Sequence, residues 1–232
     1  MKSLDMITIN NDKELPVKHE IDLIIFDLDG TLIDSLEGVL FALYQTLEHF
    51  NLPAIDREEL LSFIGISLLE MLARCSGLEI TDPELQRVYA HFKNCFALYS
   101  DKQSNLYPNT VDILNHFKDK QKVIVTNRKR EFAVNTLKHF SLAHHFEAII
   151  GSDDTECAKP SGCPIHKVLS DYNCAYERAA IVGDMDIDVY AGKAAGILTC
   201  AVRTGIGQLD DIIKADPDYL ISDLTQLKEI FK

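Results

Sequence analysis

Six short apolar runs, separated by stretches of helical periodicity, constrain the fold more than any other feature of this sequence. Their Ile and Val residues follow one another almost without interruption, as is typical of strands covered by helices on both faces. The runs are residues 21–27, 122–127, 146–152, 179–184, 198–202 and 218–222. Helical patterns lie between them, for example at residues 130–140 and 164–173. This alternation predicts an α/β fold with a doubly wound, parallel-sheet (Rossmann-like) core.

One interval breaks the alternation of strand and helix. Residues 35–104 show only helical periodicity, with apolar residues at i, i+3, i+4 and i+7 in segments such as 36–50 and 82–100. So long an interval is too much for a single connection within a compact sheet domain. We therefore expect a separate helical domain at 35–104, an α/β core at 21–34 and 105–232, and a polar lead-in at 1–20.

Composition narrows the class of partner. The chain has 232 residues and a formal net charge of −13. It has no Lys- or Arg-rich run, which argues against nucleic acid or an anionic membrane surface as the main partner. Its apolar stretches are too short to span a bilayer, and the first twenty residues lack the pattern of a secretory signal. We expect a cytoplasmic protein, monomeric or homodimeric.

The six cysteines are scattered without a CxxC pair, so we expect them to be reduced thiols. Cys157, Cys163 and His166 lie close in sequence, but no fourth ligand stands at a recognisable spacing. A zinc site there is disfavoured.

Polar residues follow four of the predicted strands at the edge where ligands bind in open parallel sheets. They are Asp27 and Asp29, Thr126 and Asn127, Lys159 in the loop after residues 146–152, and Asp184 followed by Asp186 and Asp188. Several carboxylates at one edge repel one another and tend to keep their protons. A hard divalent cation resolves this conflict, and Mg²⁺ prefers carboxylate, water and phosphate oxygens. The cluster therefore predicts Mg²⁺ and, with it, a phosphate group.

The residues at this edge have the chemical groups that phosphoryl transfer requires. A carboxylate can attack phosphorus, and a second one two residues later can protonate the leaving oxygen and then deprotonate water. Thr126 and Lys159 offer a hydroxyl and a cation to phosphoryl oxygens, and Asn127 beside Thr126 is a further candidate for binding phosphate. Gly30 and Thr31 permit a sharp turn that presents N–H groups to an anion.

Each of these signals also has a simpler interpretation when taken alone. The DxD of Asp27 and Asp29 is typical of a turn, and Asp184 with Asp188 suits a helix N-terminus. Thr126 is typical of a helix cap and Lys159 of a solvated side chain. Their order at successive strand ends favours a catalytic site.

Four segments resemble the signature motifs of the haloacid dehalogenase superfamily, in particular its phosphoglycolate phosphatase-like branch. They are "FDLDGTLIDS" at 26–35, "VIVTNR" at 123–128, "AKP" at 158–160 and "IVGDMDIDVYAGKAAG" at 181–196. The resemblance implies a nucleophile at Asp27, a general acid/base at Asp29 and phosphoryl binding by Thr126 and Lys159. It further implies Mg²⁺ held by Asp27, the Asp29 carbonyl and Asp184, with Asp188 in support. The helical domain would be a mobile cap over the substrate.

The chain also departs from the pattern of this branch. It reads "KPSGCP", two residues longer before Pro164 than the usual KPxP, and Arg128 stands where phosphoglycolate phosphatases commonly carry Lys. Arg128 is therefore a candidate for substrate specificity. In the cap, Gly65 and Ser67 are further candidates, and Arg74 and Lys93 are weaker ones.

The sequence thus predicts a Mg²⁺-dependent phosphatase for a small phosphorylated metabolite. Phosphoglycolate, a sugar phosphate, a nucleoside monophosphate and pyrophosphate all remain open as substrates. Asp29 disfavours the dehalogenase and phosphonatase branches, which lack this acid. The alternatives are a phosphomutase of the same fold (β-phosphoglucomutase-like), a phospho-accepting regulatory module and a non-catalytic binding protein.

Overall fold

The computed structural model describes residues 18–61, 63 and 68–232 and divides the chain into two compact units. Of the described residues, one unit comprises 18–33 and 106–232, and the other those within 34–105. The chain crosses between them at two short strands that pair with each other, β2 (Ile33–Asp34) and β3 (Asn105–Leu106). Of the lead-in expected at 1–20, residues 1–17 lie outside the described residues, as do the specificity candidates Gly65 and Ser67.

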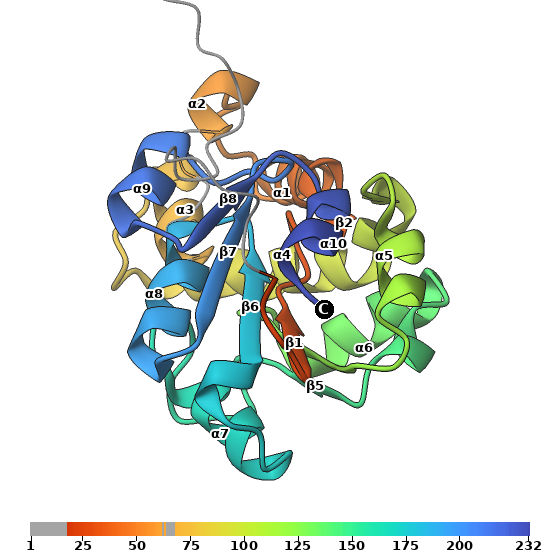
Figure 1. The fold of residues 1–232 in the computed structure, drawn as a ribbon. Coiled ribbons are helices and arrows are strands. Elements are labelled where there is room, and N and C mark those ends of the chain that lie inside the picture. Colours follow the sequence, from red (N-terminus) through yellow and green to blue (C-terminus); the bar gives the residue numbers. More distant parts are fainter. Residues whose placement is uncertain (1–17, 62, 64–67) are drawn as a thin grey trace, which may run out of the picture. The chain divides into compact units, whose positions relative to one another are not determined.

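The first unit is built on a six-stranded sheet with the order β5-β4-β1-β6-β7-β8 (Figure 1). All its neighbouring strands are parallel. The strands are β1 (Leu23–Phe26), β4 (Gln121–Val125), β5 (Ala148–Ile150), β6 (Ala179–Gly183), β7 (Leu198–Val202) and β8 (Tyr219–Ile221). Each overlaps one of the six predicted runs, and the prediction of a doubly wound parallel sheet is confirmed.

Helices cover both faces of this sheet. They are α5 (Thr110–His116), α6 (Arg130–His139), α7 (Cys163–Asp171), α8 (Asp186–Ala195), α9 (Leu209–Ala215) and α10 (Leu227–Ile230). Short 3₁₀ turns lie at Ala143–His145, Tyr176–Arg178 and Leu224–Gln226.

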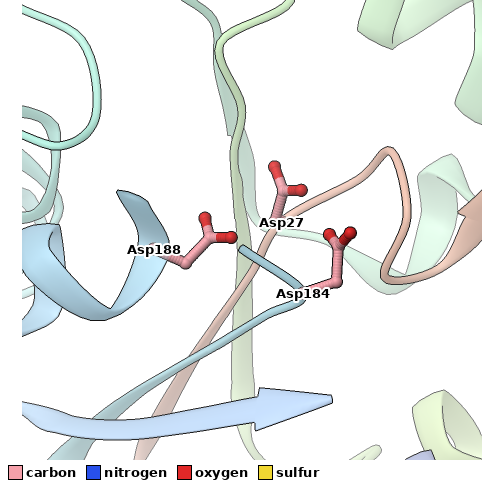
Figure 2. A group of neighbouring side chains, drawn as sticks. All are labelled: Asp27, Asp184 and Asp188. Atoms are coloured by element: carbon pink, nitrogen blue, oxygen red, sulfur yellow. The ribbon is translucent and has the colours of Figure 1, made fainter. Parts of the chain in front are cut away.

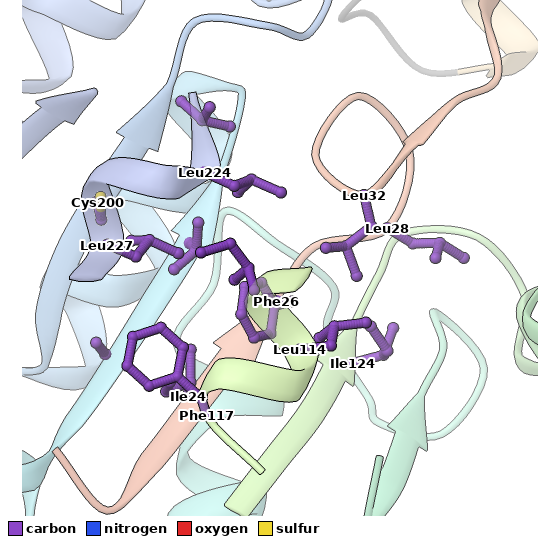
Figure 3. Close-up of a cluster of buried hydrophobic side chains, with 14 of the residues drawn as sticks. Ile24, Phe26, Leu28, Leu32, Leu114, Phe117, Ile124, Cys200, Leu224 and Leu227 are labelled. Atoms are coloured by element: carbon purple, nitrogen blue, oxygen red, sulfur yellow. The ribbon is translucent and has the colours of Figure 1, made fainter. Parts of the chain in front are cut away.

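Strand β1 shows why its apolar run is unbroken. Ile24 and Phe26 pack into a core with α5, α6 and α10, part of which Figure 3 shows around Phe26, Leu114 and Phe117. Leu23 and Ile25 enter a second core formed with α7 and α8. Successive side chains of a strand point to opposite faces, so a strand buried on both faces needs an apolar residue at every position.

The second unit is helical in its described part. It contains α1 (Leu36–His49), α2 (Arg57–Leu61), α3 (Leu68–Ser76) and α4 (Pro83–Gln103). Leucines of α1, Leu72 of α3 and Phe92 of α4 share one core. Helix α4 begins with an Asp82 side chain that accepts the Glu84 N–H at 2.8 Å and with Pro83 in its first turn, both favourable at a helix start. Gly38 allows α1 and α4 to cross closely, because an added Cβ would lie 2.7 Å from the Ser100 carbonyl oxygen.

The expectation of six reduced cysteines is wrong for two of them. Cys157 and Cys163 form a disulfide with their Cα atoms 6.0 Å apart, whereas Cys75, Cys95, Cys174 and Cys200 are free. These two residues lie six apart, one in the loop before α7 and the other at the first residue of α7, and a local bend brings them together. No helix within the described ranges has the length and apolar character required to cross a membrane.

Candidate active site

The site lies where the strand order of the sheet reverses. The chain runs outward from β1 through β4 to β5 and then returns to the other side of β1 with β6. Such a switch point opens a crevice at the carboxyl ends of the strands. Asp27 directly follows β1, Thr126 follows β4 and Asp184 follows β6. Three of the predicted site residues thus end adjacent strands.

Three carboxylates converge at this edge. Asp27 and Asp184 come from strand ends, Asp188 comes from the first turn of α8, and the three side chains point toward one another (Figure 2). Each offers an oxygen within 4.8 Å of the others, and the residues are only 7%, 0% and 2% exposed. Such a group of oxygens is the kind of ligand set that Mg²⁺ takes from proteins.

Lys159 is the cation within this cluster. Its ammonium lies 2.7 Å from Asp27 Oδ1 and 2.6 Å from Asp188 Oδ1, and its side chain is 2% exposed. The Asn127 side chain holds the Lys159 backbone at both polar atoms, donating to its carbonyl at 2.9 Å and accepting its N–H at 3.1 Å. Asn127 was predicted to bind phosphate, and in the structure both polar atoms of its side chain contact Lys159. The Cys157–Cys163 disulfide closes the loop that contains this lysine.

Asp184 is held by groups from two loops. Thr31 Oγ1 donates to its Oδ1 at 3.0 Å, and the Ile206 N–H donates to its Oδ2 at 2.9 Å. Three glycines pack against Asp184 so closely that a side chain would clash. An added Cβ would lie 2.1 Å from Asp184 Oδ2 at Gly30 or Gly205, and 2.0 Å from the Asp184 carbonyl oxygen at Gly207. The Gly30 N–H donates to Ile33 O at 2.8 Å and closes the turn.

Sequence reasoning missed the loop at residues 203–207, "RTGIG". It contributes the Ile206 backbone N–H and two glycines, which leave space for Asp184 because they have no side chain. None of these features stands out as a chemical group in a sequence. The available signal was positional: a Gly-x-Gly directly after the predicted strand 198–202, at the same edge of the sheet as the acids.

Asp29 lies beside this cluster and is paired with Arg128. The guanidinium donates from Nε to Asp29 Oδ2 at 2.9 Å and from Nη2 to Oδ1. Arg128 also donates its backbone N–H to Thr126 Oγ1 at 3.1 Å. A hydroxyl that accepts one hydrogen bond can still donate another, so Thr126 keeps the capacity to bind a phosphoryl oxygen.

Burial sets the electrostatics of the acids. It raises the pKa of Asp27 to about 7, with further increases from the charges of Asp188 and Asp29, against the lowering effect of Lys159. The pKa of Asp184 is raised for the same reason, first by burial and then by Asp27 and Asp188. Burial lowers the pKa of Lys159, but the two carboxylates beside it outweigh this, so its pKa is raised and it stays charged.

The charges within the cluster do not balance. One ammonium faces three buried carboxylates, and the raised pKa values of two of them express the deficit of positive charge. An oxygen-only ligand set with excess negative charge fits a hard divalent cation.

Comparison with known proteins agrees with this chemistry. The family model of the haloacid dehalogenase-like hydrolases matches residues 24–202. The chain belongs to this family. The resemblance in the four motifs and the enzyme class it implies, a phosphatase of this family, are both confirmed.

Two curated relatives match this family member along almost its whole length. The pyrophosphatase PpaX of Halalkalibacterium halodurans is 30% identical over 214 residues, which cover 91% of this chain and 97% of that protein. A phosphoglycolate phosphatase of Haemophilus influenzae is 30% identical over 217 residues, covering 90% and 97%. Among solved structures, a haloacid dehalogenase-like hydrolase of Streptococcus pneumoniae has a TM-score of 0.81 and 26% identity, covering 90% of this chain and 97% of that one.

We predict that Mg²⁺ raises the melting temperature, and more at pH 8 than at pH 5.5. The folded-state pKa of Asp27, about 7, exceeds the ordinary 3.8. The metal-free protein therefore loses stability as pH rises between these values. At pH 8 the cation displaces no proton from Asp27, whereas at pH 5.5 it must. Mg²⁺ at a hundred times its Kd should add about 5–10 °C at pH 8.

The measurement is thermal unfolding in EDTA and in Mg²⁺ at both pH values. The Asp184→Asn variant is the control and should show little response to Mg²⁺. An equal response of the unaltered protein at the two pH values would contradict the linkage to Asp27.

Replacing Gly205 should displace the candidate metal ligand Asp184 without unfolding the protein. In Gly205→Ala the new methyl group would lie 2.1 Å from Asp184 Oδ2, so this carboxylate must move. We expect Mg²⁺ affinity, measured by calorimetry, to fall about 10–100-fold, the usual cost of disturbing the support of a ligand.

The matched control is Gly196→Ala. Gly196 has a φ of +74° and no atom within 4 Å of an added Cβ, so the substitution strains the backbone away from the acids. It should lower stability by about 1–2 kcal/mol and leave Mg²⁺ affinity intact. Equal affinities in the two variants would show that Gly205 does not act through Asp184.

Proposed function

We propose that this protein is a Mg²⁺-dependent phosphatase that hydrolyses a small phosphate monoester through an aspartyl-phosphate at Asp27. The observation that carries the proposal is the buried cluster of Asp27, Asp184 and Asp188 around the ammonium of Lys159. Its members come from the ends of β1 and β6, the first turn of α8 and the loop after β5. Their three carboxylates and one ammonium leave an excess of negative charge that a cation would offset. An aspartate with a neighbouring lysine and a second acid two residues away has the groups that phosphoryl transfer needs.

Asp27, Asp184 and Asp188 are the residues that would hold Mg²⁺, and the resemblance adds the backbone carbonyl of Asp29. When bound, the cation would offset the negative charge of the carboxylates and of the phosphoryl group. Lys159 would share this task and orient Asp27 through its 2.7 Å contact.

In the proposed first step, a carboxylate oxygen of Asp27 attacks phosphorus and the bond to the leaving oxygen breaks. Asp29 gives its proton to that oxygen and thereby becomes a carboxylate. In the second step Asp29 takes a proton from water, and the resulting hydroxide attacks the phosphorus of the acyl phosphate. Asp27 and inorganic phosphate are released, and Asp29 is again protonated.

Substrate choice is proposed to reside in the helical unit of residues 34–105, acting as a cap. The named relatives act on phosphoglycolate and pyrophosphate according to their names, so these two compounds are the first to test. A cytoplasmic location belongs to the same proposal, and the Cys157–Cys163 disulfide, a bond more typical of oxidising compartments, is the observation that bears against it.

The Asp27→Asn variant should lose turnover by at least about 10³-fold while it keeps its fold, because an amide is not a nucleophile at phosphorus. Phosphate release and circular dichroism measure the two effects. The exposed Asp119, replaced by Asn, is the control and should retain full activity. Substantial hydrolysis by Asp27→Asn would remove Asp27 as the nucleophile.

Phosphorus NMR on a panel of phosphorylated metabolites should show inorganic phosphate as the product. The panel should contain phosphoglycolate, pyrophosphate, sugar phosphates and nucleoside monophosphates. A phosphomutase of the same fold would instead return an isomerised sugar phosphate without free phosphate, and that product would overturn the phosphatase proposal.

A further inference from the structure

Arg128 forms a two-pronged ion pair with Asp29 from a part of the chain ninety-nine residues away. Its Nε and Nη2 each donate to a different oxygen of the carboxylate. The guanidinium side chain is 6% exposed and that of Asp29 is 26% exposed. The planar fork of arginine matches both oxygens of a carboxylate and fixes its orientation as well as its distance.

Arg128 is itself held on several sides. Its Nη1 donates to Thr136 Oγ1 of α6 at 2.6 Å, and Thr136 is buried. Its backbone N–H donates to Thr126 Oγ1, and its carbonyl accepts the Ser152 N–H at 3.0 Å. Glycine at position 151 permits this approach, since an added Cβ would lie 2.9 Å from the Arg128 carbonyl oxygen. The guanidinium is therefore a fixed point within the first unit.

We propose that Arg128 is a positioning residue that holds the Asp29 carboxylate in place as the base that takes a proton from water in the second step. This inference rests on the proposed function, in which Asp29 is the acid and base. The backbone of Asp29 belongs to the turn at residues 28–33, but a turn does not fix the side-chain torsions of an aspartate. The fork of Arg128 supplies that restraint. Catalytic groups need it, because a misplacement of about 1 Å can cost about 10²-fold in rate.

This role differs from the one predicted from the sequence. Arg128 was a candidate for substrate specificity, a prediction that stays untested, and its guanidinium contacts Asp29 and Thr136 and is nearly buried. Lys159 is the cation that contacts the proposed nucleophile. Arg128 thus acts on the reaction through another side chain.

The role can be tested with a double-mutant cycle between Arg128 and Asp29. With Asp29 present, Arg128→Ala should lower kcat about 10–100-fold with little change in KM. Arg128→Lys keeps the charge but cannot form the fork, so its kcat should lie between that of the unaltered protein and that of Arg128→Ala. In an Asp29→Asn background, Arg128→Ala should change kcat less than about 2-fold, because the group that it positions is gone.

Two other roles give different results in this cycle. If Arg128 only stabilised the fold, Arg128→Ala would lower activity in both backgrounds. If it bound substrate, KM would rise in both backgrounds. Either result would overturn the inference.

Arg130 provides the matched control. It lies two residues further along, its side chain is 57% exposed, and it pairs with Asp154. Arg130→Ala removes the same charge near the site and should leave kcat and KM unchanged. A loss of kcat equal to that of Arg128→Ala would assign the effect to net charge and overturn the inference.

A measurement without substrate separates this inference from the proposed function. The Arg128 Nε–H resonance in ¹⁵N-labelled protein should shift when Asp29 is replaced by Asn and stay unchanged in Asp119→Asn. Hydrolysis of a panel compound together with an unshifted resonance would overturn the Arg128–Asp29 pair alone. A shifted resonance without hydrolysis of any panel compound would overturn the proposed function, and the positioning role with it.

Discussion

The burial of three carboxylates beside a single ammonium is the constraint on which the rest of this structure depends. Asp27, Asp184 and Asp188 are nearly removed from solvent, and Lys159 is the cation that contacts two of them. Charges of one sign in a poorly solvated space strongly disfavour full ionisation, and the raised pKa values of Asp27 and Asp184 follow from this. The protein tolerates this repulsion at one edge of its sheet, which in the proposed function is the edge where a cation and an anionic substrate would bind.

Hydrogen bonds from neighbouring residues hold the side chains in and beside this cluster in fixed orientations. Asp184 accepts hydrogen bonds from the Thr31 hydroxyl and the Ile206 backbone N–H, and Asp188 accepts one from the Met185 N–H at 3.1 Å. Asn127 holds the backbone of Lys159, and Arg128 holds Asp29. Groups that are already oriented need no rearrangement when charge moves during a reaction. The hydrogen bonds around the acids therefore serve orientation as much as stability.

Sequence reasoning recovered the sheet and the converging acids for a simple physical reason. Residues 23–26 are apolar at every position because β1 is buried on both faces, and this pattern is visible without coordinates. Parallel strands all end at the same edge, so polar residues that follow them must gather there. The positions of Asp27, Thr126 and Asp184 could be inferred from these two rules alone.

What the sequence by itself determined is therefore the α/β class, the six strands and the gathering of polar residues at one edge of the sheet. Only the tertiary structure decided which residues support them. Arg128 and Asp29 are ninety-nine residues apart, and no periodic pattern links such a pair. The loop at 203–207 acts through a backbone N–H and through absent side chains, and the Cys157–Cys163 bond depends on the bend of one loop. Hydrophobic pattern and strand order are local properties of a chain, whereas hydrogen-bond partners and close approaches depend on how distant segments pack.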